Sequence, residues 1–363
     1  MSISPTAPND ARSVFASYTL QSQMDITKGF TSGFNYLRFG LSLAVLVWHA
    51  CIITFGMDAA QNIASQWAGY ITFWILPMFF ALSGFLITSS LFRTPTLTKF
   101  LWLRFIRIYP ALTVEVILSA VILGSFATTL SLNDYFSNPV FFKYLLNTLG
   151  WIHYELPGVF TDNIFPNVIN GSLWTVPYEL ECYAVLTAMA LFTLRKRPGL
   201  FLSVFIFLCV AKTISSFFVE SVGSVPANVN GRPLVAFFVA GVYIYIYRAK
   251  IPFNRYLALA SFIAGCVLMH NYRYVFLSAF PVAYLTVWLG LHRPKNIPIV
   301  MDGDYSYGIY LYAGPLQQAL WHWTSVGKTC AGNVALSLVL VSLFAAFSWH
   351  AIEKPMLKFK KLF

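Results

Sequence analysis

The sequence predicts an all-α, polytopic membrane protein with about ten transmembrane helices and both termini in the cytoplasm. Of the 363 residues, 58% are hydrophobic and only 10% are charged, and the mean hydropathy is +0.67. Apolar runs long enough to cross a hydrocarbon core of about 30 Å recur along the chain. These runs are continuous, whereas the strands of an outer-membrane barrel alternate apolar and polar residues.

The predicted elements follow the chain in a simple order. Residues 1–33 are polar and lack the pattern of a signal peptide, so we expect a short cytoplasmic tail. Residues 34–355 form the predicted membrane domain, and 356–363 form a basic cytoplasmic tail. The predicted spans are 35–56, 70–92, 105–125, 173–194, 200–219, 233–248, 255–271, 274–291, 304–322 and 333–352.

The positive charges indicate the orientation. With the N-terminus inside, all but five of the 24 Lys and Arg residues fall in or beside cytoplasmic segments. The exceptions are Lys143, Arg232, Arg273, Lys328 and, within a span, Lys212. This bias is typical of cytoplasmic loops. The net charge of +11 therefore reflects topology, and we expect no nucleic-acid partner.

The five cysteines indicate neither a disulfide framework nor a metal site. They are scattered along the chain and form no CxxC pair. We therefore expect no metal.

The first span carries an arginine and a histidine on one face. Arg38 and His49 are eleven residues apart, which at about 100° per residue is close to three full turns, or about 16 Å along the axis. Ionisable groups inside a span are functional candidates by default. The alternative is structural: an arginine that reaches to the membrane surface and a histidine bonded to a neighbouring helix.

Two more arginines share a helical face at the cytoplasmic start of the third span. Arg104 and Arg107 are three residues apart in "FLWLRFIRIYP". A pair of guanidinium groups suits binding of phosphate. The alternative is an ordinary positive flank of a membrane helix.

Other candidates are small or acidic residues within spans. In "FFALSGFLI", Ser83 and Gly84 suit close helix packing, and Ser83 is also a candidate site residue. In "NGSLWTVPYELECY", Glu179 and Glu181 are two apart, so at most one faces His49. Trp174 and Tyr178 in the same stretch are candidate interface anchors.

Glu115 and Lys212 are also intramembrane charges. They are candidate partners of each other or of the glutamates.

Together these residues suggest a donor with an anionic head and a long uncharged arm. A coenzyme A thioester has that shape: the arginines would hold its phosphates, and its thioester would lie near His49. A neutral histidine can take a proton from an acceptor hydroxyl, and Glu179 would orient the imidazole. Direct transfer is preferred, with an acyl-histidine or acyl-Ser83 intermediate as the alternative.

These motifs resemble those of the acyltransferase-3 family of integral-membrane O-acyltransferases. Six blocks match in order between Tyr36 and Pro355. They are Arg38-x10-His49, "FFALSGFLI", Arg104-x-x-Arg107 with "IYP", "SLWTVPYELECY", "YSYGIYLY" and "IEKP". The first of these is the family's arginine–histidine signature.

The resemblance implies a bacterial inner-membrane enzyme that uses acyl-CoA, by preference acetyl-CoA, and a carbohydrate hydroxyl as acceptor. It implies His49 and Glu179 as catalytic residues and favours Glu179 over Glu181. Arg38, Arg104 and Arg107 would serve the donor, and Arg38 would either touch it or brace the site. The supporting residues are Ser83, Glu115, Trp174, Tyr183 and Tyr310. The chain departs from the family at Ala313, where many members carry histidine.

Two other classes of function compete with this interpretation. A transporter would use the intramembrane charges as proton or substrate sites, but the sequence lacks internal repeats. A scaffold would present acyl groups to a separate enzyme. The purified chain alone distinguishes them: an acyltransferase transfers or hydrolyses the acyl donor, a transporter moves solute without a donor, and a scaffold does neither.

Overall fold

Helices are the only regular secondary structure in the part of the chain that the structure describes. The computed structural model describes residues 18–26, 29, 31–65, 69–192, 194, 196–218, 231–295, 297 and 303–361. Within these residues there is no strand, and extended pairing is limited to two isolated bridges, Thr19 with Pro252 and Thr128 with Val159. The first 17 residues of the predicted N-terminal tail and the last two of the predicted C-terminal tail lie outside the described residues.

The described helices follow the predicted spans closely. The α-helices are α1 (Leu20–Ile26), α2 (Ser32–Phe55), α3 (Met57–Ser65), α4 (Gly69–Arg93), α5 (Leu97–Ile117), α6 (Gly124–Ala127), α7 (Leu132–Ser137), α8 (Pro139–Leu145), α9 (Val176–Leu191), α10 (Pro198–Ser215), α11 (Arg232–Ile246), α12 (Arg255–Met269), α13 (Ala279–Gly290), α15 (Ser306–Trp323), α16 (Cys330–Phe347) and α17 (Lys354–Met356). Short 3₁₀ or π-helical segments are η2 (Leu118–Leu123), η3 (Leu146–Leu149), η4 (Gly171–Thr175), η5 (Ser216–Phe218), η6 (Tyr272–Tyr274), η7 (Val326–Lys328), η8 (Ser348–Glu353) and η9 (Leu357–Lys361).

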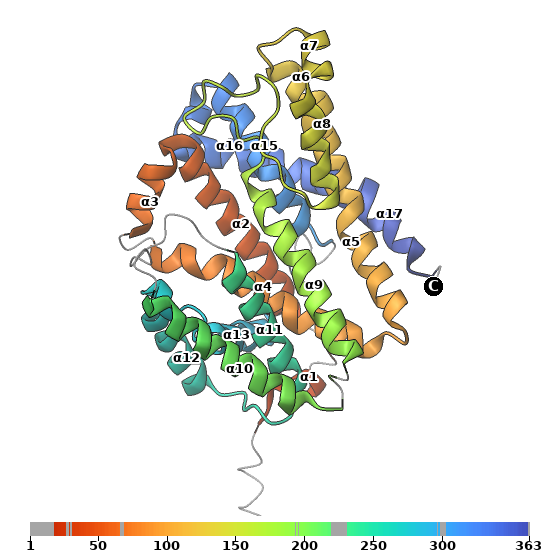
Figure 1. Cartoon of the computed structure of the whole chain (residues 1–363), viewed down its shortest axis with the longest axis vertical. Helices are drawn as coiled ribbons and strands as arrows, with labels where there is room; N and C mark the ends of the chain where they lie inside the picture. Colours follow the sequence, from red (N-terminus) through yellow and green to blue (C-terminus); the bar gives the residue numbers. More distant parts are fainter. Residues whose placement is uncertain are drawn as a thin grey trace, which may run out of the picture.

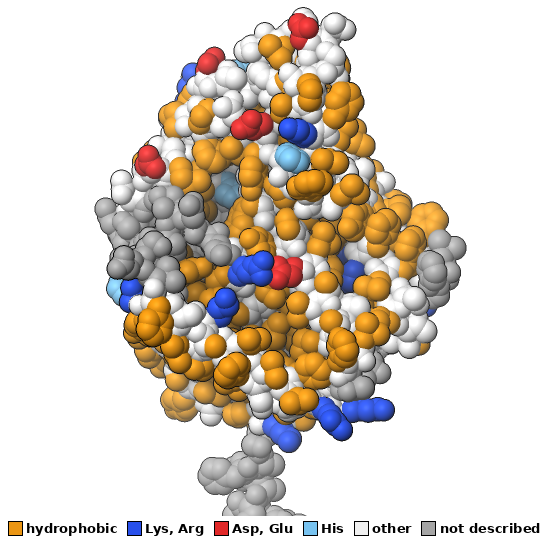
Figure 2. All heavy atoms as spheres, viewed as in Figure 1, with side chains coloured by type: hydrophobic (Ala, Val, Ile, Leu, Met, Phe, Trp, Pro, Cys, Tyr) orange, Lys and Arg blue, Asp and Glu red, His pale blue; other side chains and the backbone are white. Residues whose placement is uncertain are grey.

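Five helical segments in the described part are long and apolar enough to cross a membrane: Ser32–Phe55, Thr72–Arg93, Leu97–Ala127, Pro198–Phe218 and Cys330–Lys360. The helices α11, α12 and α13 are apolar but shorter. Hydrophobic side chains cover most of the face seen in Figure 2, as expected of a surface in contact with lipid. The protein is therefore a multi-pass membrane protein.

Two groups of helices pack together to form the domain (Figure 1). In one, α4, α11 and α13 contact one another and α12 packs on α13. In the other, α2, α15 and α16 contact one another. The two groups join where α2 meets α4 and α13. This arrangement brings α2, which carries Arg38 and His49, to the centre of the domain.

Small residues allow the closest of these approaches. A Cβ atom at Gly84 of α4 would lie 2.0 Å from the carbonyl oxygen of Phe238 in α11. A Cβ atom at Gly241 of α11 would lie 2.1 Å from the carbonyl oxygen of Ala81. Glycine at these points lets the two backbones touch. The prediction that Gly84 permits close helix approach is confirmed.

The last described part of the predicted N-terminal tail is packed against the domain. In α1, Leu20 and Met24 are buried. The backbone N–H groups of Leu20 and Gln21 donate to the carbonyl oxygens of Ile251 and Arg248, just after α11. Only two residues of α1 are buried, which is too few to register in the sequence as a hydrophobic run.

Candidate functional site

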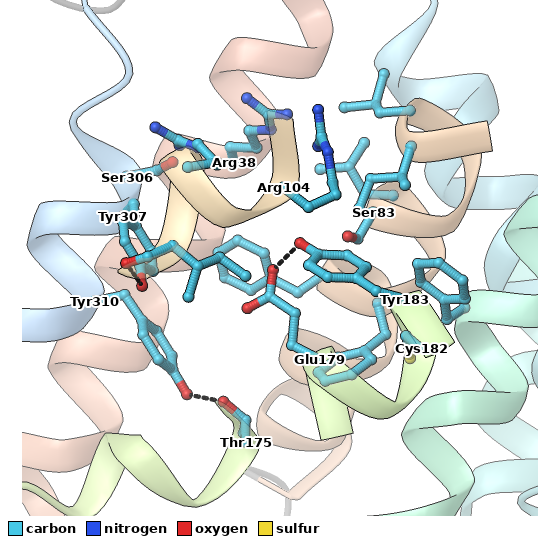
Figure 3. A pocket seen from close by; sticks show the side chains of 18 of the residues that line it. Arg38, Ser83, Arg104, Thr175, Glu179, Cys182, Tyr183, Ser306, Tyr307 and Tyr310 are labelled. Atoms are coloured by element: carbon cyan, nitrogen blue, oxygen red, sulfur yellow. Dashed lines mark hydrogen bonds between the residues drawn. The ribbon is translucent and has the colours of Figure 1, made fainter. Parts of the chain in front are cut away.

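A cavity lies among α2, α4, α5, α9 and α15 (Figure 3). Apolar side chains form much of its wall, and a few charged and hydroxyl groups project into it. These polar residues are Arg38, Ser83, Arg104, Arg107, Thr175, Glu179, Tyr183, Ser306, Tyr307 and Tyr310. Most of the predicted site residues therefore meet in one place. His49, Glu115 and Trp174 do not line this cavity.

Two of the three arginines are held by carboxylates. Asp304 Oδ2 accepts hydrogen bonds from Arg38 Nη1 and Arg107 Nη2, both at 2.7 Å. Arg107 Nη1 also donates to Glu353 Oε2 at 2.6 Å, and the Glu353 side chain is only 3% exposed. Arg107 thus ties the start of α15 to η8 near the C-terminus of the chain. Such a pair is costly to break, because the remaining charge stays buried.

Asp304 lies in the loop before α15, outside the helix. Its Oδ1 atom accepts a hydrogen bond of 2.6 Å from the Ser306 hydroxyl, while Oδ2 binds the two arginines. Asp304 therefore neutralises part of the charge on both arginines.

Arg104 differs from its neighbours because no described carboxylate pairs with it. It contacts the Ser90 hydroxyl at 3.4 Å through Nη2, and its guanidinium lies 5.8 Å from the centre of the Phe100 ring. Its Nε atom is buried and has no hydrogen-bond partner among the described residues. Arg104 lines the same cavity as Tyr183 and Glu179, which lie below it in Figure 3. The cavity thus contains a cation that no described carboxylate neutralises by direct contact.

Glu179 lies opposite the arginines, not beside His49. Its Oε1 atom accepts a hydrogen bond from the hydroxyl group of Tyr183, one helical turn further along α9 (Figure 3). The expected contact in which Glu179 orients the His49 imidazole is therefore wrong. The N-terminal part of α9 directs Glu179 into the arginine cavity, while the 3₁₀ segment η4 occupies the space next to His49.

The residue that contacts His49 is Ser172 of η4. Its Oγ atom lies 3.1 Å from His49 Nδ1, and Ser172 is fully buried. The carbonyl oxygen of Ser172 accepts a hydrogen bond of 2.7 Å from Tyr310, whose hydroxyl also bonds Thr175. Because Tyr310 and Thr175 line the cavity, this short chain of contacts joins His49 to the cavity wall.

A second buried network holds η4 in place. Asn170 accepts from the backbone N–H of Ser172 at 3.0 Å and so caps the segment. Its side-chain NH2 donates to Glu115 Oε1 at 3.0 Å and to the carbonyl oxygen of Leu311 at 2.8 Å. Glu115 also accepts from Ser119. The suggested partnership of Glu115 with Lys212 is therefore wrong, and Glu115 instead supports the loop that carries Ser172.

The remaining predicted residues lie in positions where their side chains pack against neighbouring helices or rings. Ser83 lines the cavity next to the close contact made by Gly84. Trp174 packs edge-to-face on Tyr178, with ring centres 6.0 Å apart. Ala313 is 1% exposed and packs in a small apolar cluster with Leu46, one turn before His49. A methyl group here fills core space.

Sequence reasoning missed the partners that organise these side chains. Asp304 and Glu353 lie in the stretches "DGDYSYG" and "IEKP", which overlap two of the matched blocks, and an acidic residue there is a usable signal for a partner of the arginines. Ser172 and Asn170 lie in "NGSLW", a helix-capping pattern. Their contact with His49 depends on how η4 folds back, which the local sequence does not reveal.

The fold and the cavity define a class of protein: a multi-pass helical membrane protein with a cationic polar site enclosed by its helices. The comparison with known families is more specific. The family model of the acyltransferase domain matches residues 31–352. The chain therefore belongs to the acyltransferase-3 family, and it is a membrane O-acyltransferase.

Two curated relatives match almost the full length. An O-acetyl transferase of Shigella phage Sf6 is 27% identical over 341 residues, covering 89% of this chain and 95% of the relative. Nodulation protein 10 of Rhizobium leguminosarum bv. viciae is 26% identical over 365 residues, covering 92% and 95%. No solved structure is significantly similar to the chain.

Proposed function

We propose that this enzyme transfers an acetyl group from acetyl-CoA to a hydroxyl of a glycan or glycolipid in the bacterial inner membrane. The name of the phage relative, an O-acetyl transferase, supports the choice of acetyl. We further propose ten spans with both termini in the cytoplasm and a membrane domain over residues 34–355. The distribution of Lys and Arg supports this topology.

The observation that carries the donor assignment is the uncompensated Arg104 in the cavity. A buried guanidinium with an unused Nε–H donor is a strong binding group for an anion. In this proposal Arg104 binds a phosphate of coenzyme A. Asp304 fixes Arg38 and Arg107 at the edge of the same cavity, so that they shape the site and add positive potential without making the main contact.

The catalytic step is general base catalysis by His49. For Nε2 to act as the base, Nδ1 must carry the ring proton, and Ser172 Oγ is placed to accept it. Nε2 then removes the proton from the acceptor hydroxyl as its oxygen attacks the thioester carbonyl. The C–S bond breaks, and the coenzyme A thiolate leaves and takes up a proton.

The proposal gives Glu179 a different role from the one expected from the sequence. It accepts from Tyr183 and lines the cavity that the arginines also line, so it holds the Tyr183 ring in the aromatic wall of the cavity. Tyr310 and Thr175 stand between this cavity and Ser172. In the proposal, the acyl end of the donor passes beside Tyr310 to reach His49.

The experiment that tests this function uses the purified chain in lipid nanodiscs. Radiolabelled acetyl-CoA is added with a panel of de-O-acetylated bacterial polysaccharides, and labelled ester is measured. The proposal expects acceptor-dependent ester formation by the chain alone, with nanodiscs lacking acceptor as the control. A scaffold would give no ester without a second enzyme. A transporter would instead move solute into sealed liposomes without any acetyl donor.

A further inference from the structure

Two cysteines that are far apart in the sequence meet at one end of the domain. The Sγ atoms of Cys51 in α2 and Cys330 in α16 lie 3.3 Å apart, across 279 positions of sequence. Both residues are half-buried, and both are free thiols in this structure. Cys51 lies about one turn before the end of α2, and Cys330 is the first residue of α16.

The geometry is suited to a covalent bond. A disulfide requires the two sulfur atoms to approach to about 2.05 Å, and the helices that carry them must already be in contact. The helices α2 and α16 pack directly on each other. The two Sγ atoms are already 3.3 Å apart, so they must approach each other by only about 1 Å to bond.

We infer that Cys51 and Cys330 form a disulfide that ties the His49 helix to α16. The oxidant is a second disulfide. One cysteine thiolate attacks it, which releases a first thiolate and leaves a mixed disulfide on the protein. The other cysteine thiolate then attacks the protein sulfur of that mixed disulfide and releases the second thiolate. One S–S bond forms in the protein, and the oxidant takes up two electrons and two protons to become two thiols.

This bond fixes the end of α2 that carries the proposed base. Cys51 is two residues beyond His49, so a link from Cys51 to α16 restricts movement of that turn relative to its neighbours. It also closes a very long loop, which limits the unfolded chain. The inference rests on the meeting of two thiols and does not depend on the proposed acetyl transfer.

The other cysteines provide the internal control. Cys182 and Cys209 are buried, and Cys266 is half-buried like the pair. None of the three makes a contact with another cysteine among the described residues. A closed Cys51–Cys330 bond therefore leaves three of the five cysteines free.

The test is a count of free thiols by mass spectrometry. The full chain is first reduced and then treated with oxidised glutathione in nanodiscs, denatured and labelled with maleimide. We expect that neither Cys51 nor Cys330 of the oxidised wild-type protein carries a label or a glutathione adduct, and that five labels are found if the oxidant is omitted. Peptide mapping should find Cys51 joined to Cys330.

Single variants make the result decisive. In Cys51→Ser and Cys330→Ser, the one remaining thiol of the pair should form a mixed disulfide with glutathione that persists. In Cys266→Ser, the disulfide between Cys51 and Cys330 should still form. The oxidised wild-type protein should also melt at a higher temperature than the reduced protein, and the two partner variants should lose that difference. Five labels on oxidised wild-type protein, or a bond between any other pair, would overturn the inference.

Discussion

Removing the Ser172 hydroxyl tests whether His49 is held for catalysis. Ser172→Ala deletes the 3.1 Å contact with His49 Nδ1 and leaves the backbone cap from Asn170 intact. A hydrogen bond of this kind contributes about 0.5–1.5 kcal/mol. If all of it acts on the transition state, kcat should fall about two- to tenfold. The KM for acetyl-CoA should change little, because Ser172 does not line the donor cavity.

The assay is steady-state acetyl transfer by purified protein, with donor and acceptor varied separately. Ser337→Ala is the matched control, because Ser337 is also a fully buried serine but bonds Asn333 in α16. The control should retain wild-type kcat. Equal losses in both variants would mean that any buried cavity lowers activity, and an unchanged kcat in Ser172→Ala would refute the orienting role of Ser172.

Three further predictions separate donor binding, ion pairing and packing. Arg104→Ala should weaken acetyl-CoA binding by about tenfold or more in calorimetry while the melting temperature changes little, and unchanged affinity would argue against the phosphate contact. Arg107→Ala should instead destabilise the fold by about 3–5 kcal/mol, seen as a large drop in melting temperature, because it leaves Glu353 buried and unpaired. Gly84→Ala should reduce the yield of monodisperse protein in size-exclusion chromatography, because its Cβ would meet a backbone oxygen at 2.0 Å, whereas Gly40→Ala should be tolerated since nothing lies within 4 Å of that position.

The helical fold could be predicted because the membrane imposes a simple rule. Each apolar run must become a helix, since backbone groups in lipid need internal partners. Each of the ten predicted segments accordingly contains a described helix. This rule does not predict contacts that depend on only a few side chains. The burial of Leu20 in α1 depends on two apolar residues in a polar segment, which resembles a tail.

The candidate site was predictable where helix periodicity decides the geometry. Arg104 and Arg107 share a face, and both line the cavity. Periodicity cannot show which charges are already paired, so it treated the two arginines alike, although of the two only Arg107 pairs with Asp304 and Glu353. That distinction arises from residues 197 and 246 positions away in the sequence.

The orientation of His49 was the least predictable part. Glu179 was the expected partner because carboxylates commonly orient histidine in catalytic sites. The irregular segment η4 places Ser172 there instead, and Asn170 and Glu115 support it from behind. Such a folded-back segment has no hydrophobic period from which its position can be deduced.

The most direct test of the account is to compare donor binding and acetyl transfer in one variant, His49→Ala. Purified His49→Ala should bind acetyl-CoA with wild-type affinity, because His49 does not line the cavity that contains Arg104. Transfer should fall by about a hundredfold or more, the usual contribution of a general base. Transfer within a few-fold of wild type, with donor affinity preserved, would contradict the assignment of His49 as the catalytic base.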